Sequence, residues 1–498
     1  NYKLMSHLFK DDLKIYTKIF KLIIISLLVT LTYMGTISYV GNKLIYISFS
    51  LINNFLLFFA FRKNSIFFET FFSLLLWLGF WFKFTCTITL TDGIFREGVG
   101  LFNYSEYSFD KTLIVSQIGI IAFIFAGYTR ELLFFKYPMK LNFNFSTNNF
   151  FSKNRLKIWI IFLFFFLSIG TLNFYFKIYQ KGLLPVYELN FLISGMFKWL
   201  LLFGLSTISS LILYYEANTF KKILIFSVFI VFFETFITSL SMLSRGMIFN
   251  AFAIFFGIYK FSNKINQTNE INYYIKLILI VLSLFYISVS SVNYIRANYF
   301  YVGKSALFTI EKFDKKELTS TIERKNKYAT ISEHNSEILY LLINRWVGID
   351  GVMAVSSKSE ILNPTFLKRS FKERPSAEKP TFYELTFGLE GINAMSQIYS
   401  NVKGNTLPGI IAFLFYSGSY LLIFFIMFFI TITASLFEYL SFKLSNNNLI
   451  FSALIGQVVA FRLIHFGYLP HQSYLLFGTI LITIFLVYLI NFFIKKIC

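Results

Sequence analysis

The sequence predicts an all-α protein, a polytopic membrane helix bundle, and three observations favour this class. Of its 498 residues, 56% are hydrophobic and only 14% are charged, against roughly 25% charged residues in an average soluble protein. The mean hydropathy is +0.63. Apolar runs of about 20 residues recur along the chain, and each is long enough to cross the hydrocarbon core of a bilayer as a helix. A soluble fold could not bury this much apolar surface.

Hydropathy windows predict about twelve transmembrane helices. About nine lie in a bundle formed by residues 1–292, and their expected ranges are 20–40, 44–61, 65–90, 113–135, 156–176, 191–214, 223–240, 247–261 and 273–292. About three more lie in residues 406–498, at 407–437, 449–464 and 474–494. Between these two groups, residues 293–405 form one large loop outside the bilayer, and its stretch 333–355 has the spacing of an amphipathic helix lying at the membrane surface.

The distribution of basic residues predicts the orientation of the bundle. Lysines and arginines gather in alternate loops, as at Arg62, Arg130 and Lys260, whereas the loop 91–110 carries four acidic residues. A Lys and Arg excess marks the cytoplasmic side, so both termini are expected in the cytoplasm and 293–405 on the outer side. This distribution also accounts for the formal charge of +21, and we expect no nucleic-acid partner.

Ionisable residues at membrane depth are costly and therefore mark candidate sites. In the seventh run, Glu234, Thr238, Ser241 and Arg245 have spacings that place them on one face of a helix. They are candidates to bind substrate at the outer end of that helix. The alternative is a packing stripe whose Arg245 reaches the membrane interface.

A second candidate cluster lies in the last outer turn and contains Arg462, His465, His471 and Gln472. The nearby Gly467 and Pro470, which disfavour a continuous helix, could expose the backbone to a cavity. No HExxH motif or cysteine accompanies the histidines: Cys86 lies within an apolar run and Cys498 ends the chain. We therefore expect no metal site and no cofactor.

The large loop holds a third candidate cluster. Its members are Arg345, Trp346, Asp350 and Glu390, together with His334 as the loop histidine. An arginine beside a tryptophan suits a sugar or a phosphate. A surface helix that ends at a glycine would explain the same pattern.

Four arginines from separate stretches are predicted to meet at the outer face: Arg245, Arg296, Arg345 and Arg462. Guanidinium groups bind phosphate in a bidentate manner and could neutralise a diphosphate leaving group. A glycosyl transfer also needs a group that takes the proton of the acceptor hydroxyl. The candidates for this base are His465, His471, His334, Asp350 and Glu390.

This combination of about twelve spans, a long late outer loop, outer arginines and the run Asn405-Thr406-Leu407-Pro408-Gly409 before a span resembles the Wzy-type O-antigen and oligosaccharide repeat-unit polymerases. The resemblance implies a glycosyltransferase-C-like membrane enzyme in the bacterial inner membrane, independent of metal. It implies undecaprenyl diphosphate-linked glycans as donor and acceptor, membrane lipid as surroundings, and a polysaccharide chain-length regulator as a partner. The chain departs from one pattern of the family, an Arg followed eleven residues later by Gly, since Arg345 is followed by Ser356.

Two other functions remain open at this stage. An O-antigen ligase would use the same donor but transfer the glycan to a lipid A core, with His334 as the loop histidine. A lipid-linked oligosaccharide flippase or other transporter would also need many spans and buried charges. Such carriers usually keep short connections, which the large loop disfavours.

Overall fold

A computed structural model describes residues 22–90, 102–135, 149–181, 189–220, 224–264, 285–295, 343–374, 381–388, 407–467 and 469–497, with the single positions 19, 93, 95 and 283. Within these ranges the ordered elements are all helices and no strand occurs. The prediction of an all-α fold is confirmed for this part of the chain.

The N-terminal half forms a series of helices, several of them interrupted by a π-helical turn. After a helix at Leu22–Ser38 come α2 (Lys43–Ala60), α3 (Phe67–Trp77), η1 (Leu78–Phe82), α4 (Lys83–Leu90), α5 (Glu106–Thr129), η2 (Arg130–Phe134), α6 (Asn149–Phe176), α7 (Phe191–Trp199), η3 (Leu200–Gly204), α8 (Leu205–Phe220), α9 (Ile225–Ser241), η4 (Arg245–Met247) and α10 (Ile248–Lys264).

The C-terminal half combines short helices with three long ones. Its elements are α14 (Ile349–Ser356), η6 (Ser359–Ile361), α15 (Pro364–Phe371), η7 (Glu384–Gly388), α17 (Gly409–Leu414), η8 (Phe415–Ser417), α18 (Tyr420–Leu444), α19 (Leu449–Ile464) and α20 (Pro470–Ile497).

Several of these helices are long and apolar enough to cross a membrane, and the protein is membrane-embedded on this ground. Seven qualify among the described residues: Lys43–Ala60, Phe67–Leu90, Glu106–Phe134, Phe151–Phe176, Phe191–Phe220, Tyr420–Leu444 and Pro470–Phe493. Three shorter apolar helices, Leu22–Ser38, Ile225–Ser241 and Leu449–Ile464, lie at positions where spans were predicted. The total of about twelve stays a prediction, because the range 273–292 lies largely outside the described residues.

One predicted span is wrong in its extent. The range 407–437 was expected to be a single helix, but the chain turns at Gly418, whose φ is +67°, between η8 and α18. A left-handed backbone conformation suits glycine and ends a helix. A Cβ at Gly418 would also lie 2.8 Å from the Leu362 carbonyl oxygen, so the short α17 and the long α18 are separate elements.

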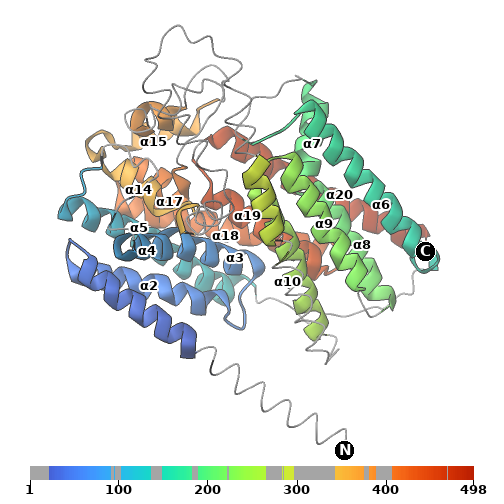
Figure 1. Ribbon diagram of the computed structural model, residues 1–498, viewed down its shortest axis with the longest axis horizontal. Helices are drawn as coiled ribbons and strands as arrows, with labels where there is room; N and C mark the ends of the chain where they lie inside the picture. Colours follow the sequence, from blue (N-terminus) through green and yellow to red (C-terminus); the bar gives the residue numbers. More distant parts are fainter. Residues whose placement is uncertain are drawn as a thin grey trace, which may run out of the picture.

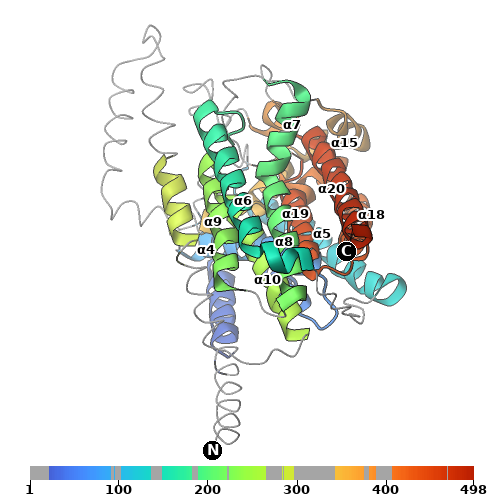
Figure 2. The same cartoon turned by 90° about the vertical axis from the view of Figure 1, so that its right-hand side faces the viewer.

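Helices from the C-terminal half lie between two groups of N-terminal helices. In Figure 1, α2 to α5 (blue to cyan) lie on one side and α6 to α10 (green to yellow) on the other, with α17 to α19 between them. Contacts agree with this arrangement, since α19 packs against α3, α8 and α10, and α18 packs against α5. Figure 2 shows α6, α8, α9 and α10 running side by side.

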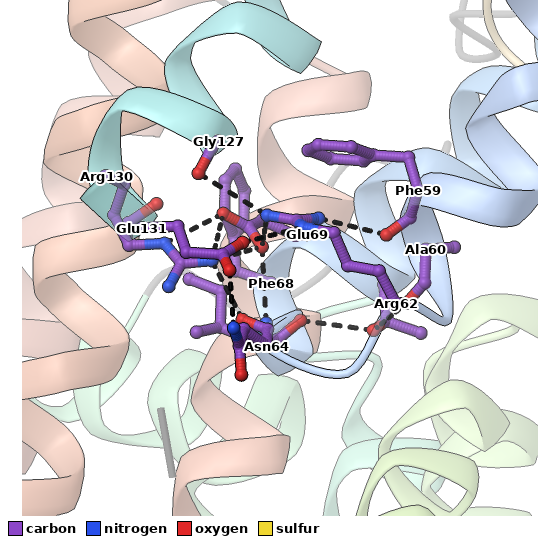
Figure 3. A network of polar contacts seen from close by, with 12 residues as sticks. Phe59, Ala60, Arg62, Asn64, Phe68, Glu69, Gly127, Arg130 and Glu131 are labelled. Atoms are coloured by element: carbon purple, nitrogen blue, oxygen red, sulfur yellow. Dashed lines mark hydrogen bonds and ion pairs between the residues drawn. The ribbon is translucent and has the colours of Figure 1, made fainter. Parts of the chain in front are cut away.

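A buried polar network joins α2, α3 and α5 near the start of α3 (Figure 3). Arg130 donates to both carboxylate oxygens of Glu69 at 2.7 to 3.0 Å. Arg62 donates to Glu69 at 2.8 Å and to Glu131 at 3.2 Å. Because each buried charge has an opposite partner, the network can hold three helices together without leaving a bare charge in an apolar core.

A carboxylate from α18 completes the start of α3. Glu438 accepts hydrogen bonds from the backbone nitrogens of Phe67 and Phe68, at 2.9 and 2.6 Å. The first N–H groups of a helix have no partner within the helix, and a negative charge is favourable there. Glu438 therefore fixes α18 to the beginning of α3 in the middle of the molecule.

The last part of the range 333–355, which forms α14, is buried inside the protein, whereas an amphipathic helix at the membrane surface was expected there. All eight residues of α14 are buried. The reason is a close approach of two backbones: a Cβ at Gly79 in η1 would lie 2.0 Å from the Val347 carbonyl oxygen, and one at Gly348 would lie 2.5 Å from the Gly79 oxygen. The two glycines let the start of α14 pack directly against η1.

Candidate anion-binding site

Positively charged side chains from three distant segments act on His465. The charges of Lys181, Arg462 and Arg345 all interact electrostatically with its ring. Lys181 follows α6, Arg345 precedes α14, and Arg462 lies in the last turn of α19. Two of the four arginines predicted to converge are therefore brought to one histidine.

His465 has a defined orientation at the end of α19. Its Nδ1 lies 2.8 Å from the carbonyl oxygen of Phe461, and the two rings lie against each other with centroids 4.1 Å apart and planes tilted by 33°. A carbonyl oxygen only accepts, so this bond requires the proton on Nδ1. In the neutral ring Nε2 then carries the free lone pair, and burial of the ring, together with the neighbouring positive charges, favours that neutral form.

The turn that carries Arg245 packs against the same aromatic ring. It opens η4, and a Cβ added to its neighbour Gly246 would lie 2.9 Å from the ring of Phe461. The short 3-10 turn between α9 and α10 thus packs against the residue that orients His465. Figure 1 shows α9, α10 and α19 as neighbouring helices.

Aromatic side chains form an apolar wall beside the cations. The ring of Phe249 lies 6.3 Å from that of Trp346 and 6.0 Å from that of Phe461, measured between centroids. Phe249 belongs to the first turn of α10 and Trp346 to the segment before α14. Flat apolar rings beside guanidinium groups suit a sugar attached to a phosphate.

Arg462 is held mainly inside the protein. It lies close enough to Tyr179 for an electrostatic interaction, and its Nε atom is buried without a hydrogen-bond partner among the described residues. A buried donor of this kind gains most from a ligand that accepts its hydrogen bond.

Asp350, one of the candidate bases, forms a buried ion pair with Lys83. The Nζ atom of Lys83 also donates to the carbonyl oxygen of Trp346, at 3.2 Å. One lysine of α4 therefore holds both the first turn of α14 and the residue beside Arg345. This geometry favours a role for Asp350 in positioning the segment 345–350 over a role as the base.

Glu234 lies in a separate polar cluster within the bundle. It accepts hydrogen bonds from Thr238 on its own helix at 3.1 Å and from Ser206 on α8 at 3.2 Å. The helix α9 ends at Ser241, so Arg245 does not continue the face on which Glu234 lies. By the rise of the helix, Glu234 lies about 10 Å before the end of α9.

Four candidate residues remain, and one of them, His471, lies within the residues that the structure describes. His471 lies in the first turn of α20, and its Nδ1 is buried without a hydrogen-bond partner among the residues that the structure describes. Arg296, His334 and Glu390 lie outside the described residues.

Lys181 and Tyr179 are the residues that sequence reasoning missed. They follow an apolar run in a short polar stretch without any motif. The only signal in the sequence is their place on the predicted outer side of that run, which they share with many other residues.

The side chains around His465 carry ammonium and guanidinium groups, which bind anions. In the described ranges no group of three or more His, Cys, Asp or Glu side chains is arranged to hold a metal ion. A phosphate or diphosphate group fits the donors that are present, because arginine can offer two parallel N–H donors to its oxygens.

Comparisons with known proteins assign no relative to this chain: no family model matches it, and neither a curated protein nor a solved structure does so.

Proposed function

We propose that this protein is a glycosyltransferase of the Wzy-type polymerase class, which joins lipid-linked oligosaccharide repeat units at the outer face of a bacterial inner membrane. The observation that carries the proposal is the gathering of Lys181, Arg345 and Arg462 around His465. The membrane-embedded fold and the aromatic wall of Phe249, Trp346 and Phe461 support it.

In the proposed reaction the hydroxyl of one lipid-linked glycan attacks the anomeric carbon of another. A new glycosidic C–O bond forms, and the bond between the anomeric carbon and the diphosphate oxygen breaks. The electron pair leaves with undecaprenyl diphosphate, and the hydroxyl proton passes to Nε2 of His465. The guanidinium groups of Arg345 and Arg462 neutralise the charge that develops on the departing diphosphate.

Among the five candidates, His465 is favoured as the base once the diphosphate is bound, because the negative charge of the diphosphate offsets the neighbouring cations that disfavour a protonated ring. Its Nδ1–H bond to Phe461 leaves Nε2 with the lone pair, whereas Asp350 is engaged by Lys83. A positioned base contributes about 100-fold to 10,000-fold to a proton transfer. Asp350 and its lysine are better suited to hold Arg345 and Trp346 in place.

The test is a reconstituted reaction with purified full-length protein in lipid nanodiscs and an undecaprenyl diphosphate-linked repeat unit. We expect dimers and longer glycans together with free undecaprenyl diphosphate. His465→Ala should lower the rate on the order of 100-fold or more, while the matched substitution Lys260→Ala, an exposed residue near the far end of α10, should not.

The products also separate the alternatives. Transfer of the glycan only to a lipid A core would indicate a ligase. Movement of the intact unit across a proteoliposome membrane, with no new glycosidic bond, would indicate a transporter and would overturn the proposal.

A further inference from the structure

The segment after α6 is fastened to the end of α9 by the side chain of Asn173. Its Nδ2 donates to the carbonyl oxygens of Tyr179 and Ser241, at 3.1 and 2.9 Å. Its Oδ1 accepts from the backbone nitrogen of Tyr179, at 2.8 Å. Asn173 is fully buried, so its amide has replaced water as the partner of three backbone groups.

Two further hydrogen bonds continue this attachment toward Lys181. Gln180 donates through Nε2 to the Ser241 oxygen at 3.4 Å, and the backbone nitrogen of Lys181 donates to the Met242 oxygen at 2.9 Å. The stretch that carries Lys181 is therefore fixed to the residues immediately before η4, where Arg245 lies.

This attachment places Lys181 against the aromatic residue that orients His465. The Nζ atom of Lys181 lies 5.6 Å from the ring centroid of Phe461, and its charge acts on His465. Tyr179, two residues earlier, interacts electrostatically with Arg462. Tyr179 and Lys181, at the two ends of this short segment, therefore both interact with residues of the candidate site.

We propose that Lys181 is a further cation of the anion-binding site and that Asn173 is the positioning residue that holds it there. That the anion is the diphosphate of a lipid carrier rests on the proposed function. Positive groups gathered around one ring repel each other, and a diphosphate among them offsets this repulsion. Lys181 therefore contributes through charge rather than through a fixed bidentate geometry.

Direct binding tests the role of Lys181. Purified full-length protein is titrated with farnesyl diphosphate and, separately, with inorganic diphosphate by isothermal calorimetry. Lys181→Ala should weaken binding about 10-fold, and Lys181→Arg should restore most of it because the charge returns. Lys260→Ala is the matched control, since Lys260 also has its Nζ near a phenylalanine ring, at 5.4 Å from that of Phe256.

A double-mutant cycle tests the role of Asn173. If Asn173 acts by holding Lys181, Asn173→Ala should weaken binding in the wild-type background but change little when Lys181 is already alanine. Asn53→Ala controls for loss of a buried amide, because among the described residues Asn53 donates only within α2, to the carbonyl oxygen of Phe49 at 2.8 Å. It should leave anion binding unchanged.

The outcomes separate this inference from the proposed function. Binding by the wild type with no effect of Lys181→Ala overturns the inference and leaves the proposed function standing. Equal losses from Asn173→Ala in both backgrounds overturn the positioning role. Binding of inorganic diphosphate as tightly as farnesyl diphosphate, with the Lys181 effect intact, supports the inference and argues against a lipid carrier. A wild type that binds neither probe overturns both proposals.

Discussion

Arg462 allows the sharpest test at the level of a single residue, because both its charge and its shape matter. Arg462→Ala is expected to lower the polymerisation rate on the order of 100-fold, as removal of one donor from a site that stabilises developing charge does. Arg462→Lys should recover little, since the ammonium group lacks two parallel donors. The measurement is the initial rate in the reconstituted reaction, normalised to folded protein.

The control for Arg462 is Arg369→Ala on α15, an exposed arginine within the large loop. It removes the same charge from the protein and should leave the rate within about twofold. A normal rate in the Arg462→Ala variant would remove that residue from the site.

The sequence predicted three residues of this site but missed Lys181, because a tertiary contact positions that lysine. Arg462 and His465 could be grouped with Arg345 because the first two lie at the end of a predicted span and Arg345 lies in the large loop, and the orientation rule sends both places to the outer face. Lys181 obeys the same rule, but so do other loop residues. What selects it is the bond from Asn173 to Ser241, 68 positions along the chain, and no local pattern encodes such a contact.

At the level of elements, the ion pair between Lys83 and Asp350 fixes α14 to α4. Removal of either partner alone leaves a buried charge without its partner, at a cost of about 3–5 kcal/mol. Lys83→Met and Asp350→Leu are therefore each expected to destabilise the protein strongly. The double variant should be less destabilised than the sum of the two single variants, as measured by unfolding in a denaturing detergent titration.

The same variants distinguish positioning from catalysis at Asp350. The double variant lacks the carboxylate and also the hydrogen bond to the Trp346 carbonyl. If Asp350 only positions the segment that carries Arg345, the double variant should retain measurable activity with weaker substrate binding. Complete loss of turnover in a stably folded double variant would instead indicate that Asp350 takes the proton.

The boundaries of the elements show what hydropathy can and cannot predict. The predicted ranges 223–240 and 449–464 match α9 and α19 closely, because polar residues flank both runs. The break at Gly418 was missed because apolar residues continue on both sides of it. The burial of α14 was missed as well, since the contact between Gly79 and Gly348 depends on the tertiary fold alone.

At the level of the whole molecule, composition was enough to predict the class. In a bilayer, apolar runs of this length fold as helices, because the backbone must satisfy its own hydrogen bonds there. Composition cannot predict how the runs pack. The position of α18 beside the start of α3, for example, depends on the contacts of Glu438 with Phe67 and Phe68, which join residues 371 and 370 positions apart.

The orientation of the bundle is the last prediction, and it decides on which side the candidate site works. In a background with Cys86→Ser and Cys498→Ser, a single cysteine is introduced either at Arg369 on α15 or at Lys260 near the end of α10, both exposed positions. A membrane-impermeant maleimide should label Arg369→Cys in intact cells. Lys260→Cys should react only after the membrane is permeabilised, because basic loops remain in the cytoplasm.

The reverse labelling pattern would place α15 on the cytoplasmic side. The expectation that residues 293–405 face outward would then be wrong. The cations around His465 would remain an anion-binding site, since their grouping does not depend on the direction of insertion. A polymerase that uses units already carried to the outer face would then be excluded. A function on the cytoplasmic side, where lipid-linked units are assembled, would take its place.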